Sequence, residues 1–172
     1  MLMAVALAAS GGAASALADD ACLDFKWDVS KERVLYAGTA AALTAGEDAK
    51  SAPVVVPDRL YRLRLMSQDR VTFTVSPTKK ISAAATYGGL ATLRVQAPGS
   101  YRFAIDLPVW IDVVSNGTRV AAEDYQAQHG CRSPHKIVEF NLVGEGPFVL
   151  QLSNATNEHV LFTVTPSPPR KL

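Results

Sequence analysis

The chain has 172 residues, a formal net charge of +1, 48% hydrophobic residues and two cysteines. This length suits one domain with a sizeable core, and the apolar content is too high for a disordered chain. A net charge this close to zero gives no sign of the basic surface that binds a phosphate backbone, and this argues against nucleic acid as a partner.

The first 18 residues resemble a secretory signal. They carry no charge, begin with an apolar stretch and end in Ala16-Leu17-Ala18, a small-x-small cleavage pattern ahead of Asp19. A membrane span is the alternative, but the apolar run is about half the ~20 residues that a span requires. We therefore expect cleavage after Ala18, a periplasmic or secreted protein, and no transmembrane span after cleavage.

The two cysteines are Cys22 and Cys131. In an oxidising compartment they are the only pair available for a disulfide, and two free buried thiols are the alternative. Asp19 and Asp20 precede Cys22, which does not fit the small or aliphatic residues of a lipid-attachment motif. The sequence favours a bridge that ties the N-terminal segment to the body of the domain.

Residues 24–37 form the one plausible helix, with Asp28 or Ser30 as the cap and Gly38 as the stop. Residues 38–51 are rich in Ala, Thr and Gly and are expected to form a loop. Pro53 and Pro57 bracket three valines, which is typical of an edge strand.

From Leu60 onward, apolar residues recur at every second position, which is typical of strands with one buried face. Turn signals separate eight or nine such runs, including one at residues 71–75. This pattern predicts a mainly β fold, an antiparallel, jelly-roll-like β-sandwich with one short N-terminal helix. The expected division is a signal at 1–18, a helix and loop segment at 19–58, the sandwich at 59–166 and a flexible tail at 167–172.

Three hairpin registers follow from matching the apolar faces of consecutive runs. The Asn116-Gly117 turn places Val113 opposite Val120 and Ile111 opposite Ala122. The Pro98-Gly99 turn pairs residues 93–97 with 101–105, and the turn at 143–147 pairs residues 138–142 with 148–152.

A metal site is one hypothesis for the segment from His129 to His135, which also contains Cys131. Histidine and thiolate are ligands of zinc and copper, and a metal-dependent oxygenase would use the same histidines. A disulfide at Cys131 removes the thiolate and favours a solvated loop instead. We expect no cofactor, with a transition metal as the open alternative.

A carbohydrate site is a second hypothesis, because Trp110 shares a strand face with Asp112 and could stack on a sugar ring. Glu123 and Tyr125 are the further candidates for ligand contact. The alternatives are that Trp110 packs under the connection formed by residues 121–136 or under the N-terminal helix, and that Asp112 forms an ion pair with Arg119.

Motifs for catalysis are lacking: the sequence has no G-x-S-x-G elbow and no glycine loop followed by a phosphate-binding lysine. We therefore expect a non-catalytic binding or accessory module whose partner is a protein or glycan of the cell envelope.

Four motifs are spread over most of the chain after the predicted signal: Cys22-x-x-Phe25-x-Trp27-x-Val29, Trp110-Ile-Asp-Val-Val, Gly146-Pro-Phe148 and Val160-x-Phe-x-Val-Thr-Pro166. In these motifs the chain resembles a family of small exported proteobacterial proteins of uncharacterised function. Some relatives carry a homogentisate dioxygenase label, but the three histidines of this chain do not supply the iron ligands of such an enzyme.

Overall fold

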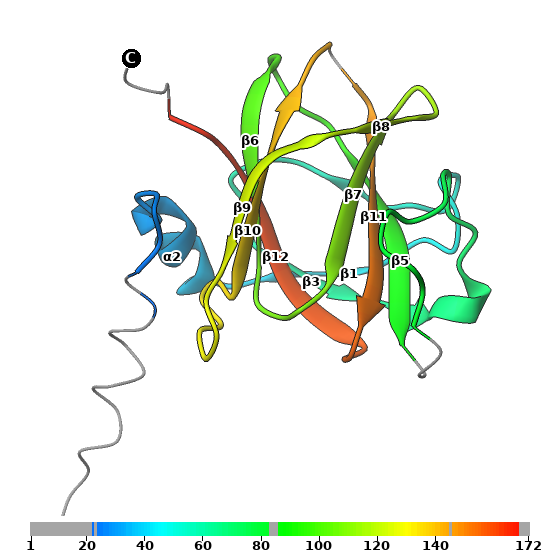
Figure 1. Ribbon diagram of the computed structural model, residues 1–172, viewed down its shortest axis with the longest axis horizontal. Coiled ribbons are helices and arrows are strands. Elements are labelled where there is room, and N and C mark those ends of the chain that lie inside the picture. The colour runs from blue at the N-terminus through cyan, green and yellow to red at the C-terminus, as the bar shows by residue number, and fades with distance from the viewer. Residues whose placement is uncertain (1–21, 23, 83–85, 145, 169–172) are drawn as a thin grey trace, which may run out of the picture.

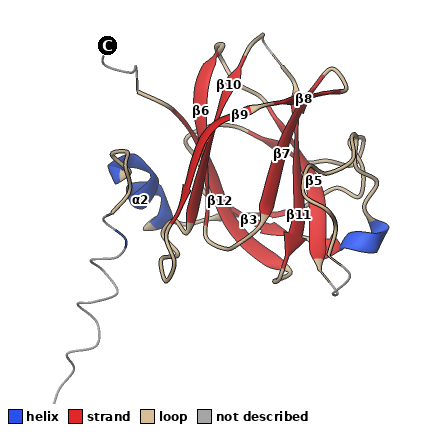
Figure 2. Ribbon diagram, in the orientation of Figure 1, coloured by secondary structure: helices blue, strands red, loops and turns tan. Residues whose placement is uncertain are grey.

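The computed structural model describes residues 22, 24–82, 86–144 and 146–168. The predicted signal at 1–18 lies outside these residues. Within them the chain is mainly β, with two mixed sheets and one short α-helix, α2 (Ser30–Tyr36) (Figure 2). None of the described helices is long and apolar enough to span a membrane.

The two sheets face each other and enclose a common interior (Figure 1). Sheet A has the order β1 (Ala41–Thr44), β3 (Tyr61–Arg64), β12 (His159–Pro166), β6 (Gly99–Ile105), β10 (Lys136–Leu142) and β9 (Ala122–Ala127). Sheet B has the order β2 (Val54–Val55), β5 (Tyr87–Leu93), β11 (Phe148–Ala155), β7 (Trp110–Ser115) and β8 (Thr118–Val120), and β4 (Met66–Ser67) also pairs with β5.

The interior is built from the alternating residues that point inward from both sheets. Phe103 and Phe140 make an edge-to-face contact, with ring centroids 5.2 Å apart, and Leu63 and Leu150 are fully buried beside them in the same cluster. Burial of this kind stabilises by roughly 25 cal/mol per Å² of apolar surface, so the period of two in the sequence reflects the main source of stability.

Neither sheet is purely antiparallel, in contrast to the expectation. β1 pairs with β3 in parallel, and β2 pairs with β5 in parallel. β1 also corrects the predicted loop at 38–51, because Leu43 lies against the main core there. The edge position expected for the valines at 54–56 is confirmed by β2.

Of the three predicted hairpins, one is confirmed. Val113 lies opposite Val120, as the Asn116-Gly117 turn requires, but pairing ends there and Ala122 belongs to sheet A. The other two are wrong: β5 and β6 lie in different sheets, and so do β10 and β11. Their apolar faces match because they meet across the interior rather than within one sheet.

The run at 71–75 is not the strand that its alternation predicts. The segment at 71–80 crosses the outer side of sheet B beside η2 (Gln68–Arg70) (Figure 2). Its backbone bonds to side chains of the sheet. The amides of Thr74 and Val75 donate to Gln151 Oε1, and the amide of Thr78 donates to Asp112. The side chains of Gln151 and Asp112 thus accept the backbone hydrogen bonds that a neighbouring strand would accept in a β-ladder.

The N-terminal segment covers the outer side of sheet A. Phe25 and Val29 pack on Ala104 and Ile137, and α2 lies over β12 (Figure 1). The helix is shorter than predicted: residues 24–29 are not helical, since Gln126 bonds to the backbone of Asp24 and Lys26.

The predicted disulfide between Cys22 and Cys131 is present, with the two Cα atoms 5.3 Å apart and a sequence separation of 109 residues. It holds the covering segment to the loop between β9 and β10. Long loops gain most from such a bridge, because closing them removes the most conformational freedom from the unfolded chain.

Replacing both cysteines, Cys22→Ser with Cys131→Ser, should lower the free energy of unfolding by about 2–5 kcal/mol. Urea denaturation of the oxidised protein and the double variant measures this, with the reduced wild-type protein as the matched control. A variant as stable as the oxidised protein would show that the bridge contributes nothing.

Candidate functional site

An apolar pocket of about 230 Å³ opens between β7 of sheet B and β9 of sheet A. Two aromatic residues stand out in its lining: Trp110 is half-buried, and Tyr125 is 69% exposed. The full lining is Trp110, Ile111, Ala122, Tyr125, Ala127, Lys136 and Val138.

The pocket exists because the chain changes sheets after β8. β8 pairs with β7 only as far as Val120, and residues 122–127 then join sheet A as its last strand. Among the described residues, the beginning of β7 at Trp110 and the outer edge of β9 therefore have no neighbouring strand between them. The space that such a strand would fill is the pocket.

The register of β9 on β10 sets which side chains line it. Tyr125 pairs with Val138 and Ala127 pairs with Lys136, so these four share the inner face of sheet A. Alanine on the edge strand leaves room that a larger side chain would fill.

Among the described residues that line the pocket, Lys136 is the one with a charged group. Its Nζ donates a hydrogen bond to the carbonyl oxygen of Val109 and lies 5.6 Å from the centre of the Trp110 ring. Lys79 Nζ lies 5.8 Å from the same ring. Burial and, to a smaller extent, the neighbouring charge of Lys79 together lower the pKa of Lys136 to about 8.

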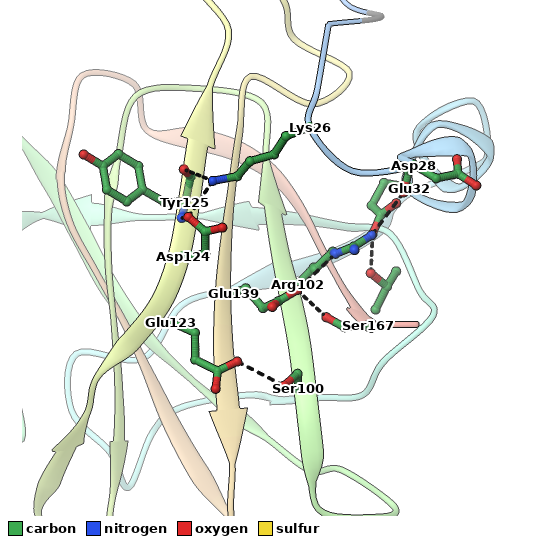
Figure 3. A network of polar contacts seen from close by, with 11 residues as sticks. Lys26, Asp28, Glu32, Ser100, Arg102, Glu123, Asp124, Tyr125, Glu139 and Ser167 are labelled. Carbon is green, nitrogen blue, oxygen red and sulfur yellow. Dashed lines mark hydrogen bonds and ion pairs between the residues drawn. The ribbon is translucent and has the colours of Figure 1, made fainter. Parts of the chain in front are cut away.

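Two of the four candidate ligand residues, Trp110 and Tyr125, come together in this pocket. Asp112 does not line it: this carboxylate is 4% exposed, accepts two hydrogen bonds from Thr78 and lies 3.5 Å from Arg119 Nε. The ion pair considered for Asp112 is thus present. Glu123 lies on β9 and accepts a hydrogen bond from Ser100 of β6, away from the pocket lining (Figure 3).

The indole nitrogen of Trp110 has no hydrogen-bond partner among the described residues, although it is buried. A buried donor without a partner costs about 1–3 kcal/mol. Trp110 lines the same pocket as Ala122, Tyr125 and Ala127, which belong to the connection at 121–136. Packing of Trp110 under that connection stays a prediction.

His129 and His135 lie in the loop between β9 and β10, with ring centroids 6.2 Å apart. His135 is buried, and this burial lowers its pKa. Cys131 is in the disulfide and is no thiolate ligand. Across the described part of the chain, no three His, Cys, Asp or Glu residues gather closely enough to hold a metal ion, and a metal at the two histidines stays a prediction.

A cluster of polar side chains lies under the N-terminal segment, on the outer side of sheet A and apart from the pocket (Figure 3). Arg102 Nε is 3.3 Å from Glu139 Oε2, its Nη1 donates to the carbonyl of Asp28, and Ser167 donates to the same Glu139 oxygen. The Arg102 guanidinium also lies 5.3 Å from the Trp27 ring. These contacts fix the covering segment in place, so the cluster has a structural role.

Sequence reasoning missed Lys136, Ala122, Ala127 and Lys79. The position of Lys136 could have been predicted from the sequence. It precedes Val138 and Phe140 by two and four residues on the same strand, so its side chain shares their inward-facing side. For Lys79 there was no such signal, because its approach to Trp110 depends on the irregular segment at 71–80.

No protein-family model matches this chain, and no curated protein matches it. Membership of the exported proteobacterial family therefore stays a prediction based on the motifs.

Lys136 should make the stability of the domain depend on pH. Its pKa in the folded protein, about 8, is below the ordinary value of 10.5, so the unfolded chain binds more protons between these values. The charged form thus opposes folding at neutral pH, and this cost disappears as the pH rises through that window.

We expect the free energy of unfolding of the wild-type protein, minus that of Lys136→Met, to rise by on the order of 3 kcal/mol from neutral pH to about pH 10.5. Urea denaturation at several pH values gives this difference. Lys80→Met, which removes an exposed lysine, should show no such rise, and a constant difference for Lys136→Met would contradict the assignment.

Proposed function

We propose that this protein is an exported, non-catalytic binding module and that the pocket between β7 and β9 is its ligand site. The observation that carries the proposal is the pocket itself: about 230 Å³ of apolar space that two aromatic side chains border at the surface. Sites for small molecules are commonly concave, mostly apolar and furnished with few polar groups.

Export is part of the proposal. The small-x-small pattern before Asp19 supports a cleaved signal, and the Cys22–Cys131 bridge supports an oxidising compartment such as the periplasm or the exterior. The two facing sheets with a shared interior support a β-sandwich, for which we keep the jelly-roll-like arrangement as a proposal.

An apolar ligand is better supported than the carbohydrate alternative. Sugar recognition needs hydrogen bonds to hydroxyl groups besides an aromatic platform, and Asp112, the acid expected for them, is already bonded to Thr78 and Arg119. The metal alternative has two histidines and no third ligand among the described residues. An apolar ligand group between Trp110 and Tyr125 would contact the apolar side chains that make up most of the lining.

A neutral probe, 3-phenylpropan-1-ol, should bind to the pocket and shift the indole N–H resonance of Trp110 in ¹⁵N-correlated NMR spectra. Tyr125→Ala should weaken binding about 3–10-fold, since an aromatic contact contributes about 0.5–1.5 kcal/mol beyond its area. Tyr125 is largely exposed, so the fold should survive the change.

Val143→Ala is the matched control, because Val143 is a 75% exposed apolar residue outside the pocket lining. Its affinity for the probe should equal that of the wild-type protein. Absence of any probe-dependent shift at Trp110 would refute the pocket as a ligand site.

A further inference from the structure

We infer that the natural ligand is a small monocarboxylic acid with an aromatic or short alkyl body, and that Lys136 Nζ binds its carboxylate while the body lies between Trp110 and Tyr125. This inference rests on the proposed function, because it specifies the ligand of the same pocket.

The first argument is the state of the Lys136 ammonium. An ammonium has three donors, and the structure assigns one of them to the neutral carbonyl of Val109. No carboxylate among the described residues forms an ion pair with it, although the side chain is largely removed from water. Charges in such places are normally paired, so the Lys136 ammonium is suited to bind an anion.

The second argument is the neighbouring charge. Lys79 brings another ammonium to the same Trp110 ring, and no ion pair of Lys79 occurs in the described part of the chain. The charge of Lys79 repels that of Lys136, and a carboxylate bound at Lys136 would offset this repulsion. The pocket is therefore electrostatically complementary to an anion.

The acids near these strands are engaged elsewhere. Asp112 bonds to Thr78, Asp124 forms an ion pair with Lys26, and Glu139 bonds to Arg102. These carboxylates therefore have partners of their own, and none of the described residues that line the pocket is an acid.

The third argument is size and lining. A volume of about 230 Å³ holds one phenyl ring or a short alkyl chain, and the walls around it are aromatic or aliphatic apart from Lys136. A free acid of this size fits with its charged end at the amine and its apolar end against the rings.

The decisive comparison is 3-phenylpropanoate against 3-phenylpropan-1-ol, which has the same body and no charge. Isothermal titration calorimetry at neutral pH should show that the acid binds about 10-fold more tightly or better, because hydrogen bonds to charged groups contribute about 1.5–3 kcal/mol. Lys136→Gln should abolish this preference, so that acid and alcohol bind with equal affinity.

Lys80→Gln is the matched control: it removes the same charge from the residue next to Lys79, and the preference for the acid should stay within about twofold of the wild-type value. Lys136→Arg, which keeps the charge, should retain most of the preference. Circular dichroism of each variant verifies the fold.

Equal affinities of the wild-type protein for acid and alcohol would overturn this inference and leave the apolar pocket in place. A preference that survives in Lys136→Gln would overturn the role of Lys136. If neither compound binds, the proposed function fails as well.

Discussion

Apolar side chains from two sheets must share one interior, and every other feature of this molecule depends on that requirement. The strands that follow one another in the chain often belong to opposite sheets, so their inner faces meet across the core rather than side by side. Where the chain crosses after Val120, the two sheets do not close against each other. The same crossing that completes the core leaves the pocket between β7 and β9.

From Leu60 onward, the alternation in the sequence predicted most of the strands and their inner faces, but not their partners. A match of apolar faces is satisfied equally by two neighbours in one sheet and by two strands that pack across the interior. For this reason residues 93–97 and 101–105 looked like a hairpin although β5 and β6 lie in different sheets. The Asn116-Gly117 hairpin was predictable because its signal is local to the turn.

The candidate site was predictable in part for a related reason. Trp110 and Tyr125 drew attention as aromatic residues, and both line the pocket. The ion pair of Asp112 with Arg119 was among the alternatives, but its hydrogen bonds to Thr78 could not be foreseen, since Thr78 follows a run at 71–75 whose alternation is typical of a strand. Only the folded chain shows that the segment at 71–80 lies across the outer side of sheet B and occupies that acid.

The edge of β9 shows how the N-terminal segment protects the molecule. An unpaired strand edge can recruit the strand of another chain and begin aggregation. Here the Asp124 carboxylate accepts the amide hydrogen of Tyr125, and the Lys26 ammonium binds both that carboxylate and the Tyr125 carbonyl (Figure 3). An incoming strand would have to displace an ion pair before it could bond to this peptide group. The segment held by the disulfide therefore also opposes self-assembly of the chain through this edge.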